Sequence, residues 1–129
     1  MTEFELFKWV HLLAAATWTG GLIVLAFLVG AARKAGADTE VLRAIARRFG
    51  VVSWSAMAIA VAVGLRLYVL RGLPWADFAL KGTLIALSIG VSLFHHITAR
   101  RTSPAMRGLQ QGIILLLAIG IFGAAVFLV

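Results

Sequence analysis

Six ionisable side chains lie within otherwise apolar stretches of this 129-residue sequence, and they are the residues with the greatest chemical potential. They are Lys8, His11, Arg66, Lys81, His95 and His96, which include all three histidines of the chain. At the centre of a bilayer such a side chain costs about 2.5–3.5 kcal/mol on insertion scales, so it usually faces protein and marks a function. Imidazole and amine groups can ligate a metal or a haem iron, and cations can bind the carboxylates of a cofactor.

The depth of these residues along their helices divides them into two layers. At a rise of 1.5 Å per residue, His11 and Lys81 lie about 10 Å and 6 Å from the expected outer ends of their helices. His95 lies about 21 Å beyond Lys81 along the same helix. We therefore predict that His11 and Lys81 share an outer level with Arg66, and that His95 belongs to an inner one.

Helical periodicity assigns faces to the same residues. At 100° per residue, His11, Ala15 and Trp18 share one stripe, and the small alanine leaves room for a flat group. A second, polar stripe consists of Lys81, Ser88, Ser92 and His95. A polar line on a membrane helix is expected to face the interior of the bundle. His96 points about 100° away from His95, so only one of the two belongs to this line.

Each of these residues also has a structural interpretation that the sequence leaves open. Lys81 and Arg66 fit side chains that snorkel to the headgroups, and His95 fits an interfacial residue that contacts lipid phosphate. Ser88 fits a hydroxyl that bonds its own helix, and Trp18 fits the helix-packing core. His11 fits a structural hydrogen-bonding group, although its position about two turns inside a span makes this interpretation the weakest of the set.

Composition limits the class of protein. With 62% hydrophobic and 13% charged residues, the chain has too few polar side chains to cover a soluble domain. There is no cysteine, which excludes disulfides and thiolate sites, and the three methionines are a poor set for Cu(I). No carboxylate lies within the spans to act as a general base or to carry protons. Haem fits better, because it needs one or two axial ligands, an apolar slot and cations for its propionates.

Four apolar stretches predict helices at about 4–30, 41–71, 77–99 and 104–129. Short connections favour antiparallel neighbours, so we predict an all-α, integral membrane, up-down four-helix bundle that forms one domain over 1–129. Asp77 is the expected N-cap of the third helix, and Ser103 before Pro104 that of the fourth. Gly72 and Pro74 are the expected breaks after the second.

The distribution of Lys and Arg predicts an orientation. Eight of the 12 lie in the first and third connections or at the helix ends beside them, at Arg33, Lys34, Arg43, Arg47, Arg48, Arg100, Arg101 and Arg107. The other four are Lys8, Arg66, Arg71 and Lys81. By the positive-inside rule the first and third connections are cytoplasmic and both termini lie on the non-cytoplasmic side. We expect a multi-pass protein of a bacterial inner membrane whose positive charge serves topology, with no nucleic-acid partner.

Three stretches carry a resemblance to known families. KWVHLLAAATWTGGLIVLAFLV, with His11 and Trp18, resembles the first helix of the copper-resistance protein D (CopD) family and of HemJ-type protoporphyrinogen oxidases. RRFGVVSWSAMAIAVAVGLRLYV and KGTLIALSIGVSLFHHITARR resemble their second and third helices, so the resemblance covers most of the chain. In the HemJ-type enzymes a first-helix histidine and a third-helix lysine act together at haem b, and these map onto His11 and Lys81.

The combined expectation is a haem b-binding membrane protein that acts in electron transfer or porphyrin oxidation. His11 is the expected axial ligand and metal residue, and Lys81 is a second ligand or a propionate partner, which makes these two the catalytic candidates. The expected cofactor-binding residues are His11, Lys81, Arg66, Trp18, Ala15, Ser88 and His95. Expected partners are the lipid bilayer, a porphyrin or haem, and a membrane electron donor or a second copy of the chain. The alternative is a copper uptake or resistance accessory protein without haem.

Overall fold

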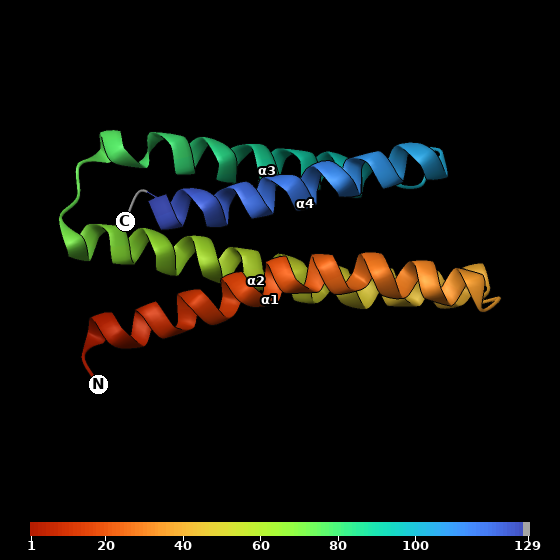
Figure 1. Ribbon diagram of the computed structural model, residues 1–129, viewed down its shortest axis with the longest axis horizontal. Coiled ribbons are helices and arrows are strands. Elements are labelled where there is room, and N and C mark those ends of the chain that lie inside the picture. Colours follow the sequence, from red (N-terminus) through yellow and green to blue (C-terminus); the bar gives the residue numbers. More distant parts are fainter. Residues whose placement is uncertain (128–129) are drawn as a thin grey trace. The chain divides into compact units, whose positions relative to one another are not determined.

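The computed structural model describes residues 1–127 and contains four long helices and one short 3-10 turn in them (Figure 1). The elements are α1 (Glu3–Lys34), α2 (Thr39–Arg71), η1 (Trp75–Phe78), α3 (Ala79–Thr98) and α4 (Pro104–Phe127). The all-α prediction is confirmed. All four long helices have the length and composition needed to cross a membrane, as expected of a multi-pass membrane protein. The predicted orientation of the termini stays a prediction.

The ends of α1 and α2 follow from local capping chemistry. Before α1, the Thr2 side chain accepts a hydrogen bond from the backbone of Glu5, whose carboxylate accepts one from the backbone of Thr2 in return. The Asp38 carboxylate accepts from the Val41 amide at 2.9 Å, so α2 begins at Thr39, two residues earlier than expected. Gly72 ends α2 with a left-handed φ of 62°, which confirms the predicted break.

The starts of α3 and α4 differ in how well they were predicted. Ser103 caps α4, because its hydroxyl accepts from the Met106 amide at 3.2 Å. The prediction of Asp77 as N-cap of α3 is wrong, because Asp77 lies inside η1 and its amide donates to the Pro74 carbonyl. The chain passes from this 3-10 turn into α3 through Phe78, which has helical dihedrals, so no extended residue is left to cap the helix.

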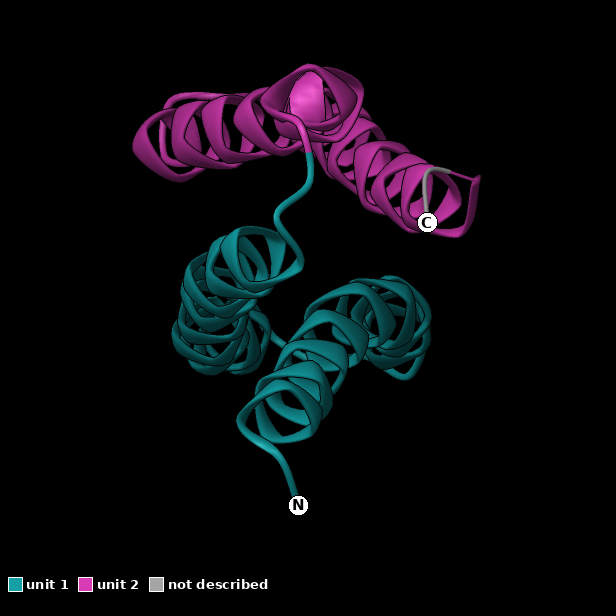
Figure 2. Ribbon diagram, turned by 90° about the vertical axis from the view of Figure 1, so that its left-hand side faces the viewer, with its two compact units in different colours: residues 1–73 teal, residues 74–129 magenta. Residues whose placement is uncertain are grey.

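The chain divides into two compact units, residues 1–73 and 74–129 (Figure 2). The first unit, called the N-terminal hairpin below, consists of α1 packed on α2. The second, the C-terminal hairpin, consists of η1, α3 and α4, with α3 packed on α4. Within each hairpin the two long helices run antiparallel, as predicted from the short connections (Figure 1).

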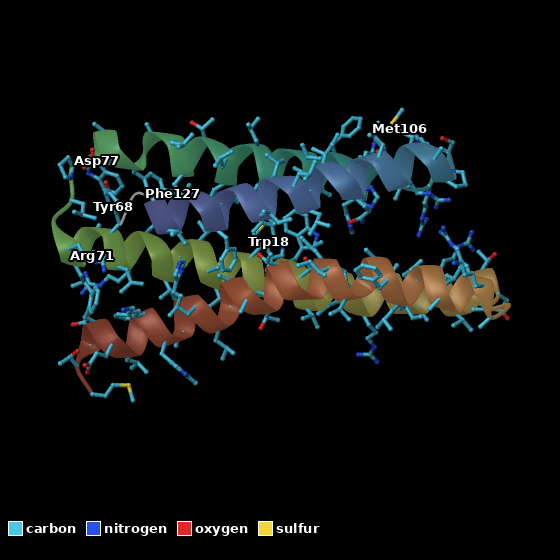
Figure 3. All side chains as sticks on the ribbon, in the orientation of Figure 1. Trp18, Tyr68, Arg71, Asp77, Met106 and Phe127 are labelled. Carbon is cyan, nitrogen blue, oxygen red and sulfur yellow. The ribbon has the colours of Figure 1, made fainter. Side chains whose placement is uncertain are left out.

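Small and large apolar residues of both helices form the core of the N-terminal hairpin. From α1 the buried apolar side chains are Ala14, Trp18 and Leu22, at a spacing of four residues, and from α2 they are Ala56, Met57 and Ala60. Trp18 lies near the middle of α1 (Figure 3). A Cβ at Gly21 would lie 2.9 Å from the Phe49 ring, so this glycine lets the ring pack against the α1 backbone.

The core of the C-terminal hairpin is more polar. Ser88 of α3 and Ala118 of α4 are completely buried, and Ile114 and Gln110 extend the buried face of α4. Of these buried polar side chains, Gln110 has a hydrogen-bond partner in α3, which is described below.

Candidate cofactor site

His11 is held by the backbone of the neighbouring helix. Its Nδ1 lies 2.8 Å from the carbonyl oxygen of Ala60 in α2. A carbonyl oxygen can only accept, so Nδ1 carries the proton and donates it. In the neutral ring this tautomer places the lone pair on Nε2, the atom through which an imidazole would ligate a metal.

Gly64 makes room for the same ring. A Cβ at this position would lie 3.1 Å from Nδ1 of His11 and 2.8 Å from its Cε1, and the second distance is closer than real Cβ contacts come. Gly64 follows Ala60 by one helical turn, so the half-buried imidazole lies along that turn of α2. We call His11, Ala60 and Gly64 the histidine seat.

The sequence pattern did not predict either α2 member of the histidine seat, Ala60 or Gly64. The group that Ala60 contributes is its backbone carbonyl, which every residue type has, so the sequence cannot indicate it. Gly64 does give a sequence signal. A glycine inside a helix lowers helix stability by about 1 kcal/mol relative to alanine, so it often marks a place where another group packs close to the backbone. The room predicted beside His11 for a flat group is therefore partly taken by α2 itself.

The remaining predicted residues of the N-terminal hairpin are Ala15, Trp18 and Arg66. Trp18 is 6% exposed and belongs to the helix-packing core, which is the structural interpretation left open above. Ala15 is half-buried, whereas its neighbour Ala14 is buried at the interface with α2.

Arg66 lies near the end of α2 and pairs with the start of α1. Its guanidinium donates to the Glu3 carboxylate at 2.8 Å, with the two side chains 49% and 58% exposed. Arg71 adds a cation–π contact 5.4 Å above the centre of the Phe4 ring. An exposed ion pair contributes roughly 0–1 kcal/mol, so another carboxylate can replace Glu3 on Arg66 at little cost.

In the C-terminal hairpin, His95 connects α3 to two glutamines of α4. Its Nδ1 lies 2.8 Å from Gln110 Oε1, and its Nε2 lies 2.8 Å from Gln111 Nε2. The carbonyl oxygen of Gln110 accepts and the amide nitrogen of Gln111 donates, so this geometry fits a neutral imidazole with both nitrogens engaged. We call these three residues the histidine clamp. The two glutamines were missed, although adjacent amides in an apolar helix are themselves an unusual signal.

The predicted polar line of α3 faces α4 at two of its positions. Ser88 is fully buried, and within the described residues its hydroxyl has no hydrogen-bond partner. His95 belongs to the histidine clamp, whereas His96 is exposed, as the angle of about 100° between them requires. Lys81 is half-buried.

The histidine seat and the histidine clamp differ in the ligands that they could supply to a metal. Within residues 1–127, no group of three or more His, Cys, Asp or Glu side chains is arranged to hold a bare metal ion. A haem iron needs only one protein imidazole, which the tautomer of His11 can supply. His11 and Lys81 belong to different hairpins, so their predicted cooperation stays a prediction. In comparisons with known proteins, the chain matches no family model, no curated protein and no solved structure.

Proposed function

We propose that this protein binds haem b in the membrane through His11 and acts in electron transfer or porphyrin oxidation, as the resemblance to the CopD and HemJ-type families implies. The observation that carries the proposal is the hydrogen bond from His11 Nδ1 to the Ala60 carbonyl. Metal-ligating histidines commonly donate their second ring nitrogen to a carbonyl or carboxylate, which fixes the ring and makes Nε2 a better ligand. Bound haem would supply the redox chemistry, and the chain would bind and orient it.

The other predicted residues take roles consistent with their surroundings. Arg66 is the proposed propionate partner, because its exposed ion pair with Glu3 can be exchanged. Lys81 is the proposed second ligand or a second propionate partner. Trp18 and Ala15 belong to the same helix as His11, and their proposed role is in the packing of that helix. Ser88 and His95 are better assigned to the packing of α3 on α4, because both ring nitrogens of His95 contact glutamines.

The visible spectrum of the purified protein tests this proposal. After haem-replete expression and purification in detergent, we expect a Soret band that is lost in His11→Ala. His96→Ala is the matched control, because it removes an exposed imidazole from a span and should leave the band unchanged. Added imidazole should restore the band in His11→Ala if the missing group is the ligand. A colourless wild-type protein, or equal loss in both variants, would contradict the proposal.

Lys81→Met separates a ligand from a bystander. If Lys81 ligates the iron, the variant should shift the Soret and visible bands, and if it binds a propionate, the variant should weaken haem retention with unchanged band positions. An unaltered spectrum with unaltered retention would return Lys81 to the snorkelling interpretation. The porphyrin-oxidation part is tested by adding protoporphyrinogen to the pigmented protein and following porphyrin fluorescence.

A second candidate is a haem-free accessory membrane protein for copper uptake or resistance. The histidine clamp favours it, because it shows that an imidazole in this protein can be satisfied entirely by neighbouring side chains. A protein that stays colourless and whose deletion changes copper tolerance of the host would support this candidate over the haem-binding one.

A further inference from the structure

A shallow depression of about 470 Å³ lies on α2 between residues 44 and 51, more than two helical turns before Ala60 of the histidine seat. Its lining residues are Ala44, Arg47, Arg48 and Val51. The spacing of three, one and three residues places all four on one face of the helix. The depression is therefore a feature of a single helical face with two guanidinium groups in its middle.

The two arginines are positioned to attract an anion. Both are exposed, and within residues 1–127 neither forms a salt bridge or a hydrogen bond with another side chain. Arg43 on α2 and Arg33 and Lys34 at the end of α1 add positive charge at the same end of the hairpin. Two acidic residues lie there: Asp38 is occupied as the cap of α2, and Glu40 lies in the first turn of α2, four residues before Ala44.

The apolar residues of the depression extend along the helix from the arginines. Val51 is the first residue of the continuous apolar part of α2, and its side chain is 67% exposed. It lies four residues, or about 6 Å along the helix axis, from Arg47, which is close to the separation expected between a headgroup phosphate and the upper acyl chain. Ala44 closes the other end with a small side chain that leaves the arginines accessible.

We propose that this depression binds one anionic phospholipid, with its phosphate on Arg47 and Arg48 and one acyl chain along Val51. Two adjacent arginines offer several donors in the planar arrangement that phosphate oxygens accept. The lining places the charged Arg47 and Arg48 next to the apolar Val51 along the helix axis. This arrangement matches an amphiphile, which has a charged headgroup and an apolar chain, better than it matches a soluble anion. The surrounding positive charge selects an anionic lipid over a zwitterionic one, whose headgroup cation it repels. This inference is independent of haem.

Lipid retention in native mass spectrometry tests the proposal. The full chain is extracted from bilayers of phosphatidylcholine and phosphatidylglycerol, and the lipids that remain bound are counted. We expect one retained phosphatidylglycerol per chain. Arg47→Gln/Arg48→Gln should lower its apparent affinity about 30-fold, since each basic residue near the surface contributes about a factor of five.

Arg100→Gln/Arg101→Gln is the matched control. It removes the same charge from a second exposed arginine pair that does not line the depression. If both double variants lose the lipid equally, the binding reflects overall charge and the proposed site is wrong.

A second variant tests whether the lipid binds in the depression itself or only to the positive charge of the surface. Ala44→Phe keeps both arginines and fills the end of the depression, so it should weaken selective retention of phosphatidylglycerol while the protein stays folded by circular dichroism. Unchanged retention in Ala44→Phe would overturn the site. Inorganic phosphate is added to delipidated protein as a further arm, and thermal stabilisation by phosphate as strong as that by phosphatidylglycerol would overturn the assignment to lipid.

Discussion

The histidine seat and the histidine clamp use the same side chain in opposite ways. In the N-terminal hairpin, His11 donates to a backbone carbonyl, which cannot rotate because it is part of α2. In the C-terminal hairpin, His95 lies between two side-chain amides that engage both ring nitrogens. A backbone partner fixes the tautomer of the His11 ring, whereas two amide partners make the His95 ring a cross-link between helices. The comparison explains why we assign cofactor binding to one histidine and packing to the other.

The largest expected effect comes from Gly64→Ala. The new Cβ would lie 2.8 Å from His11 Cε1, so the imidazole must leave its hydrogen bond with Ala60. We expect most of the haem to be lost, which the ratio of Soret to protein absorbance measures. Gly50→Ala, on the same helix with nothing within 4 Å of the added Cβ, should keep the haem and gain up to about 1 kcal/mol of helix stability. Equal haem content in the two variants would show that the seat does not position a ligand.

His95→Leu should break the clamp without removing haem. Loss of the imidazole leaves the amides of Gln110 and Gln111 without their partner, and an unsatisfied buried polar group costs about 1–3 kcal/mol. We expect lower thermal stability in detergent, measured by circular dichroism, and an unchanged Soret band after expression at low temperature. Loss of the haem from His95→Leu with unaltered helix content would transfer the ligand role to the C-terminal hairpin.

Ser88→Ala should stabilise the C-terminal hairpin. The Ser88 hydroxyl is fully buried and, in the described part of the chain, has no hydrogen-bond partner, so its removal relieves a desolvation cost of about 1 kcal/mol. The control is Ser92→Ala, where the half-buried hydroxyl should give a smaller change. A destabilised Ser88→Ala, or one that loses haem, would mean that the hydroxyl makes a polar contact with a bound group.

The smallest effect is expected at the ion pair between Glu3 and Arg66. Glu3→Gln should lower stability by roughly 0.2–1 kcal/mol, because both side chains are about half exposed. If Arg66 binds a propionate, Glu3→Gln should leave haem retention equal or higher, whereas Arg66→Gln should lower it. The rate of haem transfer to excess apomyoglobin measures haem retention in each variant. Equal retention in Glu3→Gln and Arg66→Gln would contradict the role of Arg66 as propionate partner.

Much of the fold could be predicted from the sequence because its signals are local. Long apolar stretches gave four helices, and Ser103 and Gly72 marked a helix start and a helix end through contacts with residues within a few positions along the chain. Asp77 misled the prediction, because a 3-10 turn and a capped α-helix start share the same residue types. The site was predicted only in part: His11 and His95 stood out by type and depth, but their partners did not.

The sequence by itself determined the helical class, the approximate length of each helix and the positions at which polar side chains interrupt the apolar ones. Only the tertiary structure decided that the His11 ring bonds the Ala60 carbonyl and packs against Gly64, and that His95 contacts Gln110 and Gln111. The physical reason is that helix formation follows from neighbours in the chain, whereas the rotation and register of two packed helices follow from many weak contacts summed along their whole interface. A shift of one residue in that register would give the same helices and a different partner for each histidine.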